Sequence, residues 1–216
     1  MRSLIACLAL FSVAPVEASA QLLDVGVKGG VRGTSDLNGR SLLSGESKRY
    51  ILGPAVTVNL PLNLGVEVDA LFRSFGYSSS SGNFAGFAFI RERSNSWEFP
   101  VIGKYRFPLR SLRPFVGAGV NTRTVSGSRV SSGASLVGLG PEVPFFNLRV
   151  DTHYPTTMGL VVTGGLEWKL RHFTIAPELR YQRWSQPFLD QVGGGGSYDL
   201  HSNQNEAFLI LGLSWH

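Results

Sequence analysis

The sequence predicts an all-β fold, an eight-stranded antiparallel up-and-down transmembrane β-barrel, from three observations. Eight segments alternate apolar and polar side chains with a period of two, and only an extended strand separates such residues onto two faces. Each segment is near the ~9–11 residues that a tilted strand needs to cross a bilayer. The connections alternate strictly between long and short, as in barrels with short turns on one side of a membrane and long loops on the other.

Segment 96–107, SWEFPVIGKYRF, shows the strand pattern most clearly. One face carries apolar residues with aromatic rings at both ends: Trp97, Phe99, Val101, Gly103, Tyr105 and Phe107. Glu98, Lys104 and Arg106 lie on the opposite face. Rings at both ends of an apolar face are typical of a lipid-facing strand, because amphipathic rings prefer the two membrane–water interfaces.

The other seven segments follow the same alternation. They are 23–32, 50–60, 64–75, 114–123, 157–169, 173–184 and 207–215. Short turns are expected at 61–63, 108–113 and 170–172, and long loops at 33–48, at 76–93, at 126–156 and around the glycines of 193–196. The apolar patch 143–150 within the third loop is predicted either to extend neighbouring strands or to cap the mouth of the barrel.

Composition agrees with a barrel and excludes several other classes. Charged residues make up 16% of the chain, against about 25% in soluble domains. The 26 glycines are scattered through apolar segments rather than collected in a linker. The net charge is +5, but the basic residues are spread along the chain, so no nucleic-acid partner is expected.

Residues 1–20 are expected to be a signal peptide, which leaves 21–216 as one barrel domain. Arg2 is followed by the apolar run 4–13, and Ala18-Ser19-Ala20 precede the expected cleavage point. The single cysteine, Cys7, lies inside this segment, so neither disulfides nor thiol chemistry are expected. No later stretch reaches ~18 uninterrupted apolar residues, so no transmembrane helix is expected.

Alternation alone does not say which face points outward, since a soluble barrel of the lipocalin kind would bury the apolar face. Two features favour a membrane barrel. The apolar faces are nearly free of charge, and the opposite faces mix acids with bases that can pair in a narrow bore. We therefore expect an apolar outside and a charged inside. The orientation of six residues tests this expectation: it predicts that Leu52, Val68, Val101 and Leu211 point outward and that Glu98 and Arg180 point inward.

These faces give two sets of candidate site residues. The polar network of the barrel interior comprises Lys28, Arg32, Glu67, Asp69, Arg73, Glu98, Lys104, Arg106, Arg123, Glu167, Lys169, Glu178 and Arg180. The aromatic girdle comprises Phe72, Trp97, Phe99, Tyr105, Phe107, Trp168, Phe173, Tyr181 and Trp215. No metal site or cofactor is expected, because the four histidines lie in different connections and at the terminus without ligand spacing.

Five segments in this order make the chain resemble the OmpA/OmpX-type family of small outer-membrane β-barrels. They are WEFPVIGKYRF (97–107), RPFVGAGV (113–120), GGLEWKL (164–170), PELRYQRW (177–184) and LILGLSW (209–215). The resemblance implies a place in the bacterial outer membrane, in contact with its lipid and lipopolysaccharide. In that family a terminal aromatic residue is recognised by the barrel-assembly machinery; Trp215 takes this position, although His216 follows it. The loop pattern places both mature termini in the periplasm.

Three functions are compatible with this fold. The first is a non-enzymatic role in envelope integrity, or in surface binding through the long loops to a partner that the sequence does not identify. The second is a narrow pore for ions or small solutes. The third is a lipid A-modifying enzyme, for which His201, Ser202 and Glu206 are the best candidates. The enzyme is disfavoured because adjacent strand residues such as His201 and Ser202 point to opposite faces.

Overall fold

The computed structural model describes nearly all of the chain beyond the predicted signal peptide, which itself lies outside the described residues. Described are 22–35, 37–38, 44–45, 47–83, 86–109, 112–135, 145–187, 190–192 and 199–215. Within these ranges no helix is long and apolar enough to cross a membrane.

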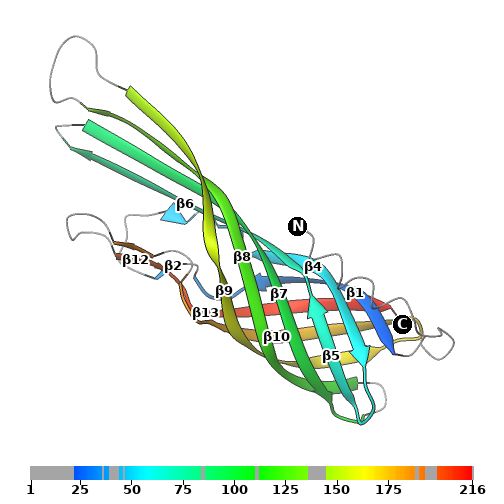
Figure 1. The fold of residues 1–216 in the computed structure, drawn as a ribbon. Helices are drawn as coiled ribbons and strands as arrows, with labels where there is room; N and C mark the ends of the chain where they lie inside the picture. The colour runs from blue at the N-terminus through cyan, green and yellow to red at the C-terminus, as the bar shows by residue number, and fades with distance from the viewer. Residues whose placement is uncertain are drawn as a thin grey trace, which may run out of the picture.

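The described strands close into one barrel (Figure 1). In chain order they are β1 (Leu23–Arg32), β4 (Tyr50–Asn59), β5 (Leu64–Asp69) continued by β6 (Leu71–Asn83), β7 (Gly86–Arg106), β8 (Leu112–Ser135), β9 (Phe145–Lys169), β10 (Phe173–Trp184) and β13 (Asn205–Trp215). Each pairs antiparallel with its neighbours. Because β1 pairs with both β4 and β13, the sheet is closed and has no open edge along β1. The predicted eight-stranded antiparallel barrel is confirmed.

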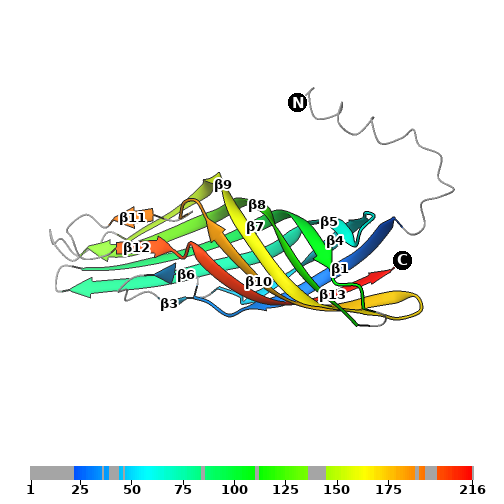
Figure 2. The same ribbon diagram turned by 90° about the horizontal axis from the view of Figure 1, so that it is seen from below.

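The β4–β5 hairpin turns where Pro61-Leu62-Asn63 predicts a tight turn. Leu62 and Asn63 have φ of 63° and 61°, and the Leu64 amide donates to the Pro61 carbonyl at 3.4 Å. Two successive positive φ angles are those of a type I′ turn, whose twist matches that of the flanking strands. The first strand begins and the last strand ends at this same end of the barrel, since Leu23 pairs with Val58 and Val25 pairs with Trp215 (Figure 2).

The prediction of long loops at 76–93 and 126–156 is wrong for most of their length. Strands β6 to β9 continue beyond the barrel as a four-stranded sheet, here called the arm, made of 76–83, 86–95, 125–135 and 145–154 (Figure 1). Away from the barrel neither face of a strand has to be apolar, so these Ser- and Gly-rich stretches lack the alternation that marks the other strands. Residues 145–150 belong to β9, as the first alternative for the apolar patch predicts, while 143 and 144 lie outside the described residues.

An irregularity in strand pairing lies where the arm leaves the barrel. Arg123 pairs with Thr157, but Val125 pairs with Tyr154, so β9 has one more residue than β8 across this step. Pro155 lies in that extra stretch. Such bulges bend a strand and are positions where proline is tolerated within a sheet.

Shorter strands complete the end of the molecule that carries the arm. Strands β11 (Asp190–Val192), β12 (Asp199–Ser202) and β2 (Leu37–Asn38) form a three-stranded sheet, and β3 (Ser44–Gly45) pairs with β6. The predicted loop at 33–48 is therefore partly built as strand pairs, and so are the residues on both sides of 193–196, which themselves lie outside the described residues.

The two faces of the barrel strands lie as predicted. Leu52, Val68, Val101 and Leu211 are exposed on the outside, by 57%, 45%, 42% and 57%. Glu98 and Arg180 are fully buried inside. Apolar side chains of the inward face, among them Ile102, Phe115 and Phe208, fill space between the charged groups. An apolar outside around a charged inside reverses the usual arrangement of a soluble protein.

Candidate functional site

The period of two brings the predicted interior residues together from strands far apart in sequence. Twelve of the thirteen are buried in the bore: Lys28, Arg32, Glu67, Asp69, Arg73, Glu98, Lys104, Arg106, Arg123, Glu167, Glu178 and Arg180. They form two clusters and one separate ion pair. We name the clusters by the barrel end to which they are nearer: turn-side and loop-side.

The turn-side ion cluster consists of Lys28, Glu67, Asp69, Lys104, Glu178 and Arg180. The Lys28 ammonium donates to Glu67 at 2.5 Å and to Glu178 at 2.7 Å. The Lys104 ammonium donates to the other oxygen of Glu67 at 2.6 Å. Two lysines from β1 and β7 are thus held by one carboxylate of β5.

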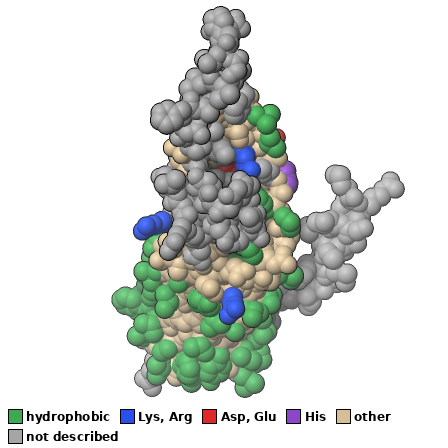
Figure 3. All heavy atoms as spheres, turned by 90° about the vertical axis from the view of Figure 1, so that its left-hand side faces the viewer, with side chains coloured by type: hydrophobic (Ala, Val, Ile, Leu, Met, Phe, Trp, Pro, Cys, Tyr) green, Lys and Arg blue, Asp and Glu red, His purple; other side chains and the backbone are tan. Residues whose placement is uncertain are grey.

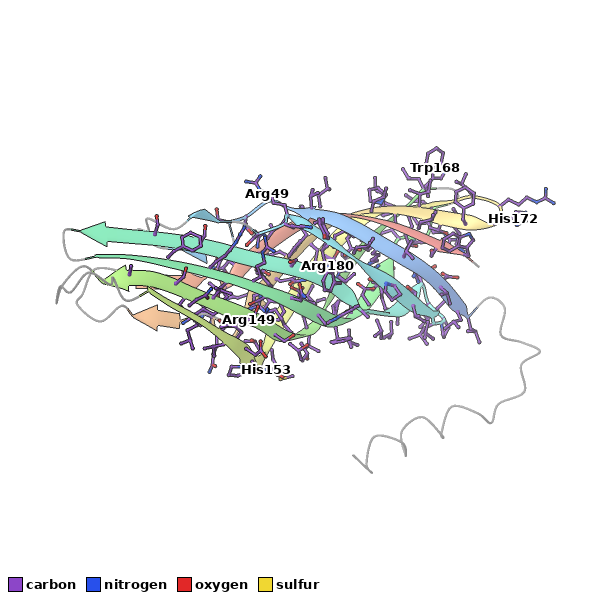
Figure 4. All side chains as sticks on the ribbon, turned by 90° about the horizontal axis from the view of Figure 1, so that it is seen from above. Arg49, Arg149, His153, Trp168, His172 and Arg180 are labelled. Carbon is purple, nitrogen blue, oxygen red and sulfur yellow. The ribbon has the colours of Figure 1, made fainter. Side chains whose placement is uncertain are left out.

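Arg180 lies within the barrel (Figure 4) and joins its opposite walls. Its guanidinium donates to Asp69 at 2.8 Å and to Glu178 at 2.6 Å. Strands β5 and β10 are four strands apart in either direction around the barrel, so the contact with Asp69 spans the bore. With three cations and three carboxylates the cluster is neutral, which makes burial of its charges tolerable.

The loop-side ion cluster consists of Arg32, Arg73, Glu98, Arg123 and Glu206, with Glu206 at its centre. Arg73 binds the Glu206 carboxylate with both terminal nitrogens, at 2.7 Å and 2.9 Å. The Trp184 indole also donates to Glu206, at 2.9 Å. Arg123 and Arg32 approach the same carboxylate at 3.7 Å and 4.0 Å. Bidentate arginine–carboxylate pairs of this kind are among the stronger charged hydrogen bonds.

Aromatic faces support the arginines of the loop-side ion cluster, where three cations meet two carboxylates. The Arg123 guanidinium carbon lies 4.0 Å from the centre of the Trp184 ring. The Arg73 guanidinium carbon lies 4.1 Å from the Phe75 ring. A cation over a ring face is stabilised by the ring quadrupole, more strongly when water is excluded. The two clusters together fill the middle of the bore with buried charged and aromatic side chains.

A vestibule opens into the bore at the short-turn end. This cavity of about 550 Å³ reaches from Asn63 and Ser214 at the mouth to Lys28 and Glu67 of the turn-side ion cluster. Beside it Arg106 donates to Glu167 at 2.8 Å, as an ion pair separate from both clusters. Water from this end therefore reaches the turn-side ion cluster.

Lys169 corrects the predicted interior set. It has the inward parity of its strand, but it is the last residue of β9 and its side chain is exposed. It lines the vestibule instead of joining a buried cluster. The alternation of side chains along a strand does not show where the strand leaves the barrel. The predicted network therefore included one residue too many, Lys169.

Glu206 was missed as an interior residue by the sequence pattern. The last strand was expected to begin at 207, whereas β13 begins at Asn205. Glu206 has the same parity as Phe208 and Ile210, both buried, and extending the alternation by one residue would have found it. The sequence alone suggests for Glu206 only a place beside His201 and Ser202 as a possible catalytic group. Its carboxylate instead binds Arg73 and Trp184 inside the bore.

The outside of the barrel carries an apolar belt bordered by the predicted aromatic residues, and Trp168 projects outward in Figure 4. Hydrophobic side chains gather around the barrel end of the molecule in Figure 3. By strand register the turn-end ring comprises Tyr105, Phe107, Trp168, Phe173 and Trp215, and the loop-end ring comprises Phe72, Trp97, Phe99 and Tyr181. Between the two rings, no outward-facing residue of the described strands is charged.

No family model matches the chain, and no curated protein matches it. Among solved structures it is similar to Neisserial surface protein A, with 12% identity, 90% of this chain and 96% of that chain covered, and a TM-score of 0.46. It is also similar to the N-terminal β-barrel domain of Pseudomonas aeruginosa OprF (11% identity, 89% and 96% covered, TM-score 0.43). A third similarity is to the outer-membrane protease OmpT of Escherichia coli (10%, 91% and 97%, 0.41).

Proposed function

We propose that this chain is an integral protein of the bacterial outer membrane whose barrel is a closed, non-enzymatic scaffold. The observation that carries the proposal is the uncharged outer face between two aromatic rings. From Trp97 to Phe107 the strand advances ten residues, or ~33 Å at ~3.3 Å per residue. At a tilt of 35–45° this is a height of ~25 Å, which is the height of the apolar band of outer-membrane barrels.

The ion clusters support a closed bore. An eight-stranded barrel leaves an interior that side chains can fill, and here buried charged groups reach across it from opposite walls, as Arg180 does to Asp69. Removing such groups from water is costly unless each is paired, and every charged group of the turn-side ion cluster makes at least one ion pair. We therefore assign the network a structural role: it replaces water in the bore and fixes the strands around it.

The arm favours surface binding over a purely structural role in the envelope. Integrity of the envelope would need only the belt, whereas β6 to β9 continue far beyond it as an ordered sheet. With short turns and both mature termini in the periplasm, this sheet lies outside the cell. Contact with outer-membrane lipid and lipopolysaccharide, and insertion by the barrel-assembly machinery through Trp215, belong to the same proposal.

Measurement of ion conductance distinguishes a closed scaffold from a narrow pore. The observation that favours a pore is the vestibule. In planar bilayers the wild-type protein is expected to show no steady open level, because the turn-side ion cluster blocks the bore above the vestibule. The double variant E178A/R180A removes the groups at the centre of that cluster and is expected to give discrete openings. The measurement is single-channel recording, with insertion checked by heat-modifiable migration on SDS gels.

The matched control is R106A/E167A, which also removes one cation and one carboxylate, but beside the vestibule and not in the cluster. It is expected to stay silent. A steady open level in the wild-type protein would show that the barrel is a pore and not a closed scaffold. Equal conductance of the two double variants would show that the turn-side ion cluster is not the barrier.

A further inference from the structure

The Thr174 hydroxyl, at the short-turn end of the bore, has no hydrogen-bond partner among the described residues. The residue is only 5% exposed, and its side chain lines the vestibule. Buried polar groups are nearly always hydrogen-bonded, because removing one from water without a partner is costly. A buried hydroxyl that faces a cavity therefore points to a polar ligand in the vestibule.

Polar side chains on the neighbouring strands continue from Thr174 around the mouth. In the strand register Thr174 of β10 pairs with Lys169 of β9 on one side and with Ser214 of β13 on the other. All three have inward parity and line the vestibule. Neighbouring strands are about 4.8 Å apart, so a ligand at the mouth meets one ammonium and two hydroxyls side by side.

The wall formed by β7, β8 and β9 adds positive charge to this site. Arg106, Arg113 and Lys169 line it together with one carboxylate, that of Glu167. Both Glu167 oxygens accept from the Arg106 Nε, at 3.0 Å and 2.8 Å. In the described part of the chain neither Arg113 nor Lys169 forms an ion pair, and the Arg113 Nε donates to an uncharged group, the Leu109 carbonyl. The wall therefore has two more cations than carboxylates.

The vestibule has the size and the field of a site for a small anion. Its volume of about 550 Å³ lies within the range of ~300–1,000 Å³ usual for ligand pockets. One row deeper than Thr174, Ala176 pairs with Gly212, and these small side chains leave room above the turn-side ion cluster. Over the whole described lining there are five cations and three carboxylates. A concave wall of low dielectric constant focuses the field of such a surplus and concentrates anions inside.

We propose that the vestibule binds a small hydroxylated phosphomonoester, of the sugar phosphate class. Its two surplus positive charges match the nearly two negative charges of a phosphate monoester at neutral pH. Arg113, Lys169 and the Thr174 hydroxyl hold the phosphate oxygens, as charged hydrogen bonds from guanidinium and ammonium groups do well. Asp24, which accepts from Asn59 at 2.9 Å, lies three strands from Lys169 and faces the sugar hydroxyls instead.

This site goes beyond the proposed function, because the barrel itself forms it. In the proposed orientation the vestibule opens to the periplasm, so its ligand is a soluble solute of that compartment and not a lipid. Binding can be measured without a membrane. A protein that binds the ligand but does not insert into bilayers loses only the proposed function, whereas one that inserts without binding loses only this site.

Isothermal titration calorimetry with glucose 6-phosphate tests the proposal, with the purified protein folded in a maltoside detergent at low ionic strength. The wild-type protein is expected to bind it at least tenfold more tightly than glucose, inorganic phosphate or glucuronate. These three carry the hydroxyls alone, the phosphate alone, and the hydroxyls with a single carboxylate charge. Undetectable binding of glucose 6-phosphate, or equal affinity for any of the three, would overturn the proposal.

The variant R113S/K169S is expected to lose about a hundredfold in affinity for glucose 6-phosphate, or tenfold for each charged contact. The control R171S/R183S also removes two cations. Both of its arginines are exposed and neither lines the vestibule, so it is expected to bind within twofold of wild type. An unaffected R113S/K169S variant, or an equal loss in the control, would show that the charge of the vestibule does not hold the ligand and would overturn the proposal.

Replacing Thr174 by valine separates a role in binding from a role in folding, because valine keeps the branched shape and removes the hydroxyl. Without ligand, the urea midpoint of T174V is expected to be no lower than that of wild type, since the hydroxyl has no partner among the described residues. Its affinity for glucose 6-phosphate is expected to fall about fivefold, the loss of one hydrogen bond. Unchanged affinity would mean that the ligand is not the partner of this hydroxyl, and the proposed site would be wrong.

Discussion

Replacing Glu206 by glutamine is expected to destabilise the folded barrel by about 3–5 kcal/mol, the cost of breaking a buried ion pair by removal of one partner. Glu206 accepts hydrogen bonds from Arg73 and Trp184 and lies within 4.0 Å of Arg123 and Arg32. Without its charge, the three buried guanidinium groups of the cluster lose the carboxylate that they share. The measurement is the free energy of unfolding in urea, with the protein refolded in lipid vesicles.

The matched control is E167Q at the vestibule. Glu167 also binds one arginine with good geometry, Arg106 at 2.8 Å, but water reaches this pair, so the expected loss is about 1 kcal/mol. Losses of similar size in both variants would mean that water enters the loop-side ion cluster as freely as the vestibule. The closed bore would then have to be abandoned.

The variant L211R is expected to lose about 2–4 kcal/mol of stability in vesicles, the cost of an arginine on the lipid face near the midplane. Leu211 lies on β13 midway between Trp215 of the turn-end ring and Ala207, which pairs with Tyr181 of the loop-end ring. Its side chain is 57% exposed. In water, a charge at so exposed a position would change stability by no more than about 0.5 kcal/mol. The same urea titration in vesicles measures the difference.

Leu148 provides the control for this substitution. It is 59% exposed, nearly the same fraction as Leu211, but it lies on the arm, beyond the belt. L148R is expected to stay within about 0.5 kcal/mol of wild type. If both arginines were tolerated equally, the two leucines would have the same surroundings, and the belt would be facing water.

Which side chains of each barrel strand point outward could be predicted from the sequence, because one face of the strand meets the outside of the barrel and the other face meets the bore. The alternation in 97–107 put Val101 outside and Glu98 inside, and both positions are found there. Lys169 shows the limit of the method, because parity carries no information on where a strand ends. The arm shows another limit: with water on both sides, its residues are under no pressure to alternate.

Partners within the bore could not be predicted, for a geometric reason. Which charges meet depends on how the closed sheet places one strand against another, as when Arg180 reaches Asp69 across the whole bore. Sequence separation gives no hint of that contact. Glu206 was missed because the predicted strand began one residue past it, which placed Glu206 in a loop instead of at the centre of a buried cluster. Strand boundaries are the least reliable part of a prediction from sequence pattern.

The central claim is that the outside of this barrel contacts acyl chains and the bore does not. Quenching of tryptophan fluorescence by brominated acyl chains tests it directly, because Trp97, Trp168 and Trp215 lie in the two rings while Trp184 is 2% exposed inside the bore. In variants that keep one tryptophan each, with phenylalanine at the other three positions, the three ring tryptophans are expected to be strongly quenched and Trp184 hardly at all. Ring tryptophans that brominated lipid leaves bright, or a Trp184 quenched as strongly as they are, would contradict the account.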